Sequence, residues 1–294
     1  MAAIAETIDT RFTLRPGSAD DATACGQICY DAFGAISAQH GFPSDFPSAE
    51  VATQLLSGLL SHPGFYSVVA QSQGRIAGSN FLDERNSIAG IGPITVAPRI
   101  QNQAIGRRLM EDVLQRVAER RFPGVRLLQA AYHNRSLSLY SKLGFVAREP
   151  LSTMQGTPPR VSLPGHRVRP ATLDDLPGCN RLCLQVHGHD RGGELRDAIA
   201  QGTARVVEHE GRIVGYTSII AFFGHTVGES NDAVKALIAA ASEYPGPGFH
   251  VPTRNAELFR WCLEHGLRVV QPMTLMTIGL YNEPAGAYLP SILY

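Results

Sequence analysis

The segment from Val96 to Met110, VAPRIQNQAIGRRLM, holds the residues whose types and spacing point most directly to chemistry. It follows an apolar run, contains a lone glycine at Gly106, and turns basic at Arg107 and Arg108. Free backbone amides at a helix N-terminus carry partial positive charge and bind anions. A glycine there lets a ligand approach the backbone closely. The segment is therefore either a plain strand-to-helix connection or a cradle for a phosphate group.

The neighbouring elements must position this segment. Apolar residues recur at every fourth position and predict one buried helix face: Ile105, Leu109, Val113 and Val117. The preceding run GIGPITV reads as a strand, and Pro93 predicts a bulge or an unpaired position because proline has no N–H. The run VRLLQAAY predicts a buried strand. The run NRSLSLYSKLGF predicts a short helix that Asn134 caps and Gly144 ends in the left-handed conformation.

The chain contains an internal repeat. LRPGSADDATACGQIC, from Leu14, matches VRPATLDDLPGCNRLC, from Val168, in its Arg-Pro, its Asp-Asp and both cysteines. QGRIAGS then matches EGRIVGY, ITV matches HTV, and LGFVAREPLSTM matches HGLRVVQPMTLM, in the same order and at steadily falling offsets. Four ordered matches indicate two copies of one fold. We predict domains over residues 11–158 and 166–284, joined by a Pro- and Gly-rich linker.

Each copy reads as α+β: a mixed, mostly antiparallel sheet flanked by helices. The run FYSVVAQSQGRIAGSNFL predicts a hairpin with a Gln-Gly turn. The tail over residues 285–294 is too apolar for water, so we expect it to pack on a domain or on a partner.

Composition narrows the classes of function. The 294 residues carry 26 basic and 26 acidic side chains, which argues against binding to nucleic acid or to an anionic membrane. The N-terminal segment lacks the basic start and following apolar run of a signal peptide. No stretch of the sequence approaches the about 20 apolar residues of a membrane span. Five cysteines without a CxxC pair indicate free thiols in a reducing cytoplasm. We expect a cytoplasmic monomer or homodimer.

The loop and the later helix together resemble the GNAT superfamily of N-acetyltransferases, here as tandem domains. The family pattern Q-x-x-G-x-G corresponds to Gln101-Asn102-Gln103-Ala104-Ile105-Gly106, and the downstream helix carries Asn134, Tyr140 and Leu-Gly-Phe. The resemblance implies acetyl-coenzyme A as the acyl donor, its pyrophosphate held by the backbone amides from Gln101 to Arg107. Ala104 stands where the family has glycine, and its methyl is tolerated if φ is negative.

The resemblance also assigns the remaining site residues. The strand splays at its bulge, the backbone of Ile94, Thr95 and Val96 pairs with the pantetheine arm, and the Val96 amide faces the thioester oxygen, where it would stabilise an oxyanion. Asn134 contacts the arm, and Tyr140 lies beside the sulfur as general acid for the leaving thiolate. The alternatives are an ordinary buried strand with an edge proline, and a tyrosine packed under its helix.

The sequence therefore predicts acetyl transfer to a primary amine of a small molecule or peptide. A longer acyl donor remains an alternative, as does a non-catalytic acyl-coenzyme A sensor that regulates a partner. The sequence does not identify a general base. Asp83 and Glu84 are the carboxylates nearest to the slot in sequence, but a turn position indicates solvated side chains for both. Water can serve as the base instead. The segment HGFPSDFPSAE lies where the family builds its acceptor pocket, but it does not identify the acceptor.

Two further patterns favour structure over chemistry. The run HGHD, His187 to Asp190, and His225 lack the regular spacing of metal ligands, so we expect loop histidines and no metal. The cysteine pairs of both copies fit small core residues. The second copy lacks the glycine loop and basic pair, and Trp261 and Cys262 stand near the position of Tyr140, so we expect one coenzyme A per chain.

Overall fold

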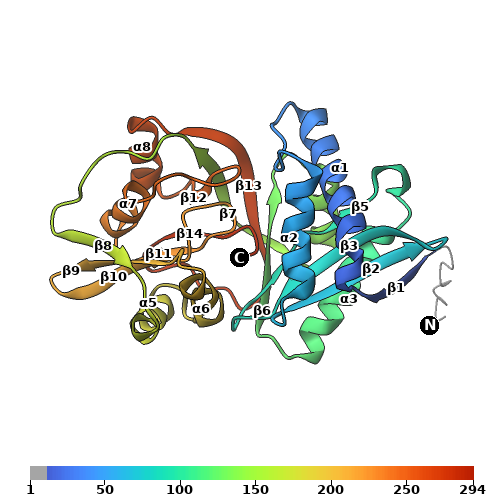
Figure 1. Cartoon of the computed structure of the whole chain (residues 1–294), viewed down its shortest axis with the longest axis horizontal. Helices are drawn as coiled ribbons and strands as arrows, with labels where there is room; N and C mark the ends of the chain where they lie inside the picture. Colours follow the sequence, from blue (N-terminus) through green and yellow to red (C-terminus); the bar gives the residue numbers. More distant parts are fainter. Residues whose placement is uncertain (1–11) are drawn as a thin grey trace.

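The computed structural model describes residues 12–294 (Figure 1). The start of the chain, on which the absence of a signal peptide was argued, and residue 11, the expected start of the first domain, lie outside the described residues. No helix within residues 12–294 has the length and apolar content needed to span a bilayer.

The first half alternates strands and helices in the predicted order. Its strands are β1 (Thr13–Pro16), β2 (Phe65–Ser72), β3 (Arg75–Asp83), β4 (Ala89–Ile91), β5 (Thr95–Val96), β6 (Gly124–Ala130) and β7 (Val146–Gln155). Its helices are α1 (Ala22–His40), α2 (Ala49–Ser61), α3 (Ile105–Glu119) and α4 (Asn134–Lys142), with 3-10 turns at Ala19–Asp21 and Pro98–Ile100.

The second half repeats this order, with shorter counterparts of α1, α2 and α3. Its strands are β8 (His166–Pro170), β9 (Arg205–His209), β10 (Arg212–Thr217), β11 (Thr226–Gly228), β12 (Phe249–Pro252), β13 (Arg268–Gly279) and β14 (Ala287–Leu289). Its helices are α5 (Leu176–His187), α6 (Gly192–Ala200), α7 (Asn231–Ala239) and α8 (Ala256–Glu264), with a 3-10 turn at Leu173–Asp175.

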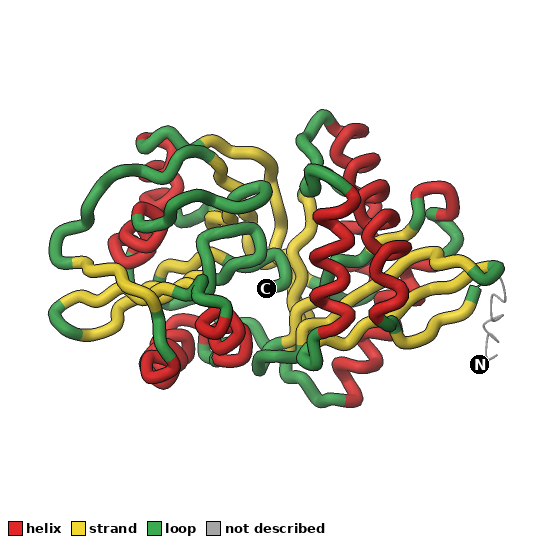
Figure 2. The backbone as a smooth tube through the Cα atoms, in the orientation of Figure 1, coloured by secondary structure: helices red, strands yellow, loops and turns green. Residues whose placement is uncertain are grey.

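Two sheets carry these elements (Figure 2). The nine-stranded sheet has the order β1-β2-β3-β4-β6-β13-β7-β12, with β5 paired to β3, and the five-stranded sheet has the order β14-β11-β10-β9-β8. The β4–β6 pair is parallel and the other pairs are antiparallel. The predicted α+β class, with mixed and mostly antiparallel sheets, is confirmed.

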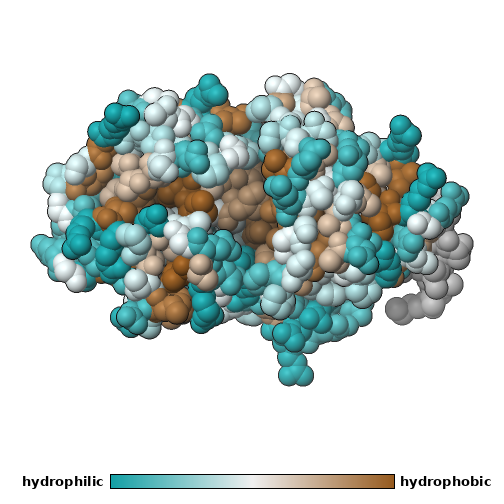
Figure 3. Space-filling view, viewed as in Figure 1, coloured by the Kyte–Doolittle hydropathy of each residue, from teal (hydrophilic) through white to brown (hydrophobic). Residues whose placement is uncertain are grey.

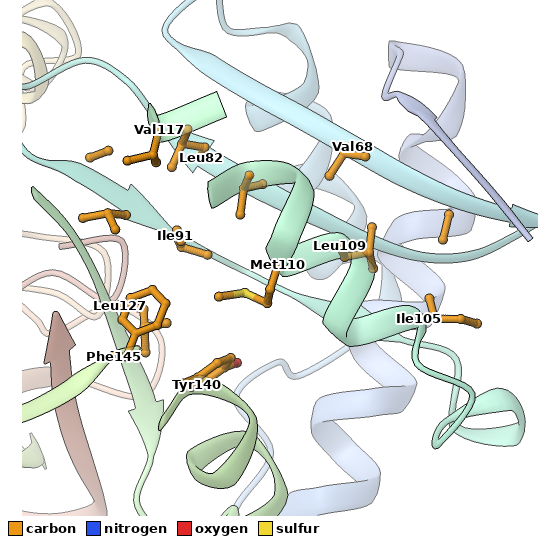
Figure 4. Close-up of a cluster of buried hydrophobic side chains, with 14 of the residues drawn as sticks. Val68, Leu82, Ile91, Ile105, Leu109, Met110, Val117, Leu127, Tyr140 and Phe145 are labelled. Carbon is orange, nitrogen blue, oxygen red and sulfur yellow. The ribbon is translucent and has the colours of Figure 1, made fainter. Parts of the chain in front are cut away.

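Helices cover both faces of the first sheet, because neighbouring strand residues point to opposite sides. Val68 packs in the cluster under α3, together with the four apolar residues of the predicted helix face (Figure 4). Val69, one residue later, packs under α1 and α2. Cys25 and Cys29 belong to that second cluster, and all five cysteines are buried and free, as expected.

The two copies begin with the same ion pair. Arg15 and Asp21 approach to 2.7 Å, and Arg169 and Asp175 approach to 2.7 Å. In each copy this carboxylate also accepts a hydrogen bond from a backbone amide three residues earlier. The guanidinium holds the pKa of both carboxyls below the ordinary value. The Arg-Pro and Asp-Asp matches in the sequence therefore correspond to one conserved corner between first strand and first helix of each copy.

The halves exchange strands. β13 of the second half lies between β6 and β7 of the first, and β7 lies between β13 and β12. β7 and β13 are the repeat-equivalent segments LGFVAREPLSTM and HGLRVVQPMTLM, and they pair antiparallel with Leu151 opposite Met273. Those two residues are equivalent positions of the repeat, so a local twofold axis passes between them. The sequence repeat did not predict this exchange, because strand pairing is not visible in an alignment of copies.

The C-terminal tail is buried, as predicted. β14 pairs with β11, and the Ile292 amide donates to the Phe222 carbonyl at 2.9 Å. Tyr294 is 1% exposed, and its ring lies between the guanidinium groups of Arg126 and Arg191. In the space-filling view an apolar hollow opens between the two halves (Figure 3).

We expect Leu151→Ala to lower the free energy of unfolding by about 2–5 kcal/mol, because it leaves a cavity at a site that is 1% exposed. Since the exchanged strands join both halves, chemical denaturation followed by circular dichroism should show one shifted transition. Leu173→Ala, at a side chain 61% exposed, is the control and should change stability little. Separate melting of one half would contradict this view of the fold.

Candidate active site

A cavity of about 450 Å³ lies against the interrupted strand of the first half. Its walls come from α1, from residues 91–96, from the start of α3, from β6 and from α4, with a further wall from the second half. Ten of the predicted site residues line it: Ile94, Thr95, Val96, Gln101, Asn102, Ala104, Ile105, Gly106, Arg107 and Tyr140. Gln103 and Asn134 do not.

The strand divides at Gly92 and Pro93, as the proline predicted. Before this point β4 pairs with β6 through Ala89–Val125 and Gly90–Arg126, and after it β5 pairs with β3. Among the described residues no strand pairs with the other edge of β5. β5 and β6 therefore diverge, and the edge of β5 that faces β6 is left open beside the cavity.

The direction of the Val96 amide follows from its neighbour. The Ala97 amide donates to the Ala77 carbonyl of β3 at 2.9 Å. Successive residues of an extended strand direct their N–H groups to opposite edges. The Val96 amide therefore faces the open edge, and Gln101 Nε2 donates to the Val96 carbonyl at 3.1 Å and closes the following loop.

The start of α3 leaves its first amides free. No side chain within residues 12–294 caps this helix, whose N-cap is Ala104. Ala104 has φ +61°, so the condition of a negative φ is not met: an alanine stands in the left-handed conformation, which costs an L-residue about 1–2 kcal/mol. A Cβ at Gly106 would lie 3.7 Å from Val96 Cγ2 and 3.9 Å from Leu139 Cδ2.

An unpredicted arginine orients the loop. Arg135 donates through Nη2 to Gln101 Oε1 at 2.7 Å and through Nη1 to Asn102 Oδ1 at 3.2 Å. Arg135 directly follows Asn134, and this position beside a predicted site residue is the one feature of the sequence that could have indicated its role. Asn134 itself is the first residue of α4 and not its cap, because His133 occupies the N-cap position. Asn134 lines a shallower recess that it shares with Asn102, Arg107 and Arg135.

Positive charge surrounds the start of α3. Arg107 lines the cavity and pairs with Glu111 at 2.7 Å. Arg108 lies 4.0 Å from the same carboxylate and does not line the cavity. Gln103 is exposed beside them.

Tyr140 lines the cavity from α4, where its ring packs edge-on against Phe145 at 6.1 Å between centroids (Figure 4). The side chain is 7% exposed. Burial raises the pKa of its phenol above the ordinary value. The hydroxyl therefore stays protonated at neutral pH, as a proton donor requires.

The carboxylates near the hairpin end are not in the cavity. Asp83 is 2% exposed and pairs with Arg85 at 2.6 Å, so the expectation of a solvated turn residue is wrong for it. Glu84 pairs with Arg116 at 2.7 Å. Arg85 also reaches Asp197 of the second half at 2.9 Å. These carboxylates hold arginines that support the fold.

A different carboxylate lines the cavity. Asp45, in the loop between α1 and α2, accepts a hydrogen bond from Gln271 Nε2 at 2.9 Å. Burial raises the pKa of its carboxyl. It stands in the segment HGFPSDFPSAE, which the resemblance placed at the acceptor pocket, but no spacing singled out this residue.

The equivalent site of the second half is closed. Val227, the counterpart of Val96, pairs with Tyr288 of β14, so the edge that is open in the first half is covered by the tail. The helix that follows, α7, is capped, because Ser230 Oγ accepts from the Ala233 amide. The predicted loss of the cradle therefore has two physical parts, a filled edge and a capped helix.

His189 and His225 lie in loops, as expected, whereas His187 is the last residue of α5. His187, His189 and His225 are 1%, 4% and 1% exposed; the His187 ring stacks on His189 and packs at a tilt against His225. Burial lowers the pKa of all three imidazoles. No group of three or more metal-ligating side chains occurs within residues 12–294.

The family model of the acetyltransferase (GNAT) domain matches residues 31–158. These residues are a GNAT acetyltransferase domain. They contain the open strand edge, the start of α3 and Tyr140, so most of the cavity wall belongs to the GNAT domain, and the second half completes it. No curated protein matches the sequence of the chain.

Solved structures share the fold of the whole chain. A putative acetyltransferase from Pyrococcus horikoshii is 17% identical with a TM-score of 0.73, and the match covers 96% of each chain. A GCN5-related N-acetyltransferase from Sphaerobacter thermophilus is 16% identical with a TM-score of 0.63, over 94% of this chain and 98% of that one. A tandem GNAT protein from the clavulanic acid biosynthesis pathway is 14% identical with a TM-score of 0.55, over 91% and 98%. The chain thus has a tandem GNAT fold.

We expect Gly106→Val to weaken coenzyme A binding at least tenfold without unfolding the GNAT domain. The new side chain would stand at the start of α3, in the cavity wall beside Val96 and Leu139, where the backbone must approach a phosphate group. Isothermal titration calorimetry measures the affinity, and circular dichroism checks the fold. Gly58→Val, at another helical glycine with open space around it, is the control. Wild-type affinity in a folded Gly106→Val protein would contradict the assignment.

Proposed function

We propose that this protein transfers an acetyl group from acetyl-coenzyme A to a primary amine of a small molecule or peptide, in the cavity of the GNAT domain. The observation that carries the proposal is the open edge of β5 leading directly to the uncapped start of α3, with Tyr140 in the same cavity.

The residues present fit the donor that GNAT enzymes use. Free amides from Ile105 to Arg107, the helix dipole and the nearby Arg107 suit a pyrophosphate, which carries strong negative charge. Arg135 holds the loop side chains and adds a second guanidinium at this end. The open β5 edge offers unpaired backbone groups to the amide-containing pantetheine arm.

Two groups act on the reacting atoms in this proposal. The Val96 amide donates to the thioester oxygen and stabilises the negative charge that develops there. Tyr140 donates its phenolic proton to the thiolate that leaves. When bound, acetyl-coenzyme A supplies the activated acetyl group. Asp83 and Glu84 are excluded as general base by their ion pairs and positions, so we assign removal of the amine proton to water in the cavity.

We expect Tyr140→Phe to lower kcat by about 10²–10⁴-fold, because general acid catalysis is worth that much, and to leave acetyl-coenzyme A affinity nearly unchanged. Thiol release with a panel of amines measures kcat. Since burial raises the Tyr140 pKa, the phenol stays protonated as pH rises, and its own titration should cause no loss of kcat up to about pH 10.

Tyr30→Phe, at a half-buried tyrosine of α1 outside the cavity, is the control and should keep wild-type kcat. Unchanged turnover in Tyr140→Phe would refute the general-acid role. Binding of acetyl-coenzyme A without cleavage by any amine would favour the acyl-coenzyme A sensor. A faster reaction with a longer acyl thioester would replace acetyl as the donor group.

We expect one coenzyme A per chain, because β14 covers the second edge and Ser230 caps the second helix. Calorimetric titration of the full chain should give one site, lost in Gly106→Val and unaffected by Asn231→Ala or Asp232→Ala. Two equivalent sites per chain would overturn this part of the proposal.

A further inference from the structure

The cavity has a second end, away from the start of α3, whose walls are apolar. Part of it comes from α1 and the loop after it, and part from the second half of the chain, including the tail: Phe33, Phe46, Phe222, Phe223, Ile292 and Leu293. Phe33 and Phe46 pack together at 6.1 Å between centroids, and Phe222 and Phe223 pack at 5.7 Å. Four aromatic rings therefore enclose this end.

One negative group stands among these apolar walls. Asp45 is the single acidic residue among the described residues that line the cavity. Its Oδ1 accepts from Gln271 Nε2 at 2.9 Å, and Gln271 Oε1 accepts from the Tyr132 hydroxyl at 3.1 Å. Gln271 is 1% exposed and lies in β13. The exchanged strand therefore fixes the orientation of the Asp45 carboxylate.

The carboxylate has unused capacity for a ligand. Within residues 12–294 no protein group donates a hydrogen bond to its Oδ2, and no arginine or lysine pairs with it. An ionised carboxylate taken from water needs a cation or further hydrogen bonds to offset its lost hydration. The guanidinium groups of the cavity, Arg107 and Arg135, lie at the pyrophosphate end. Asp45 is only half-buried, so its free Oδ2 is available to a cationic group that a ligand brings into the cavity.

We propose that this end is the acceptor subsite and that it binds a compact amine with an aromatic or branched aliphatic body, whose ammonium group pairs with Asp45. This inference rests on the proposed function. The four rings favour an apolar body, and one carboxylate matches one positive charge. The subsite is shared between the halves, because Gln271, Phe222, Phe223 and the tail belong to the second half. The second half thus contributes to the choice of acceptor although its own slot is closed.

Phenethylamine tests the proposal on the full chain, with binding measured by calorimetry in the absence of any acyl donor. We expect it to bind at least tenfold more tightly than ethanolamine, spermidine or 2-phenylethanol, which lack the apolar body, the compact shape or the charge. Asp45→Asn keeps the shape and the Gln271 hydrogen bond, and should weaken phenethylamine binding about 10- to 100-fold. It should leave the weak binding of 2-phenylethanol unchanged, since that probe carries no charge.

Matched controls separate recognition from folding. Asp31→Asn changes an exposed carboxylate of α1 outside the cavity and should keep wild-type affinity. Phe223→Ala should weaken phenethylamine binding, whereas Phe259→Ala, at a half-buried ring of α8 outside the cavity, should not. In turnover assays Asp45→Asn should raise KM for the amine and leave KM for acetyl-coenzyme A unchanged.

Unchanged phenethylamine affinity in Asp45→Asn, or equal affinity for all four probes, would overturn the subsite. The result is distinguishable from failure of the proposed function, because amine binding is measured without the donor. If phenethylamine binding depends on Asp45 but acetyl-coenzyme A does not bind, the subsite stands and the acetyltransferase proposal falls. If acetyl-coenzyme A binds at one site and Asp45→Asn does not change phenethylamine affinity, the acetyltransferase proposal stands and the subsite falls.

Discussion

The antiparallel pairing of β7 with β13 is the contact on which the other features of this structure depend. It joins the same segment of the two copies about the Leu151–Met273 position, so the nine-stranded sheet needs strands from both halves. Backbone groups buried in a sheet centre need partners, and here each half supplies them to its neighbour. The exchange also fixes Gln271 against the loop that carries Asp45. One backbone pairing thus determines both the stability of the core and the shape of the cavity wall.

The contrast between the two copies shows how little must change to open or close a slot. Both copies have a short strand followed by a helix, with Val96 and Val227 at equivalent positions. In the first copy a proline interrupts the strand and the helix starts without a side-chain cap. In the second copy Ser230 caps the helix and the tail pairs with the strand. The fold is the same, and the difference lies in which backbone groups already have partners.

Local features were predictable from the sequence, and contacts between the copies were not. The helix face of α3, the interruption at Pro93 and the left-handed Gly144 follow from periodicity and from the conformations of proline and glycine. The φ of Ala104 could not be told from the sequence, and in the structure it is +61°, in a loop where Arg135 donates to Gln101. Asp45 could not be singled out, since its importance comes from Gln271, far away in the sequence.

The C-terminal tail fills the strand edge of the second half from within the same chain. Along β11 it occupies the edge that stays open along β5, and it is tethered to the surface it covers by a short connection from β13. A tethered segment has an effective local concentration in the millimolar range or above, which a dissolved ligand of micromolar abundance does not match. The strand edge of β11 in the second half is therefore filled by β14 of the same chain and is not available to a dissolved ligand. Ile292 and Leu293 of the tail then continue into the wall of the cavity in the first half. The segment that closes the slot of the second copy therefore also shapes the cavity of the first.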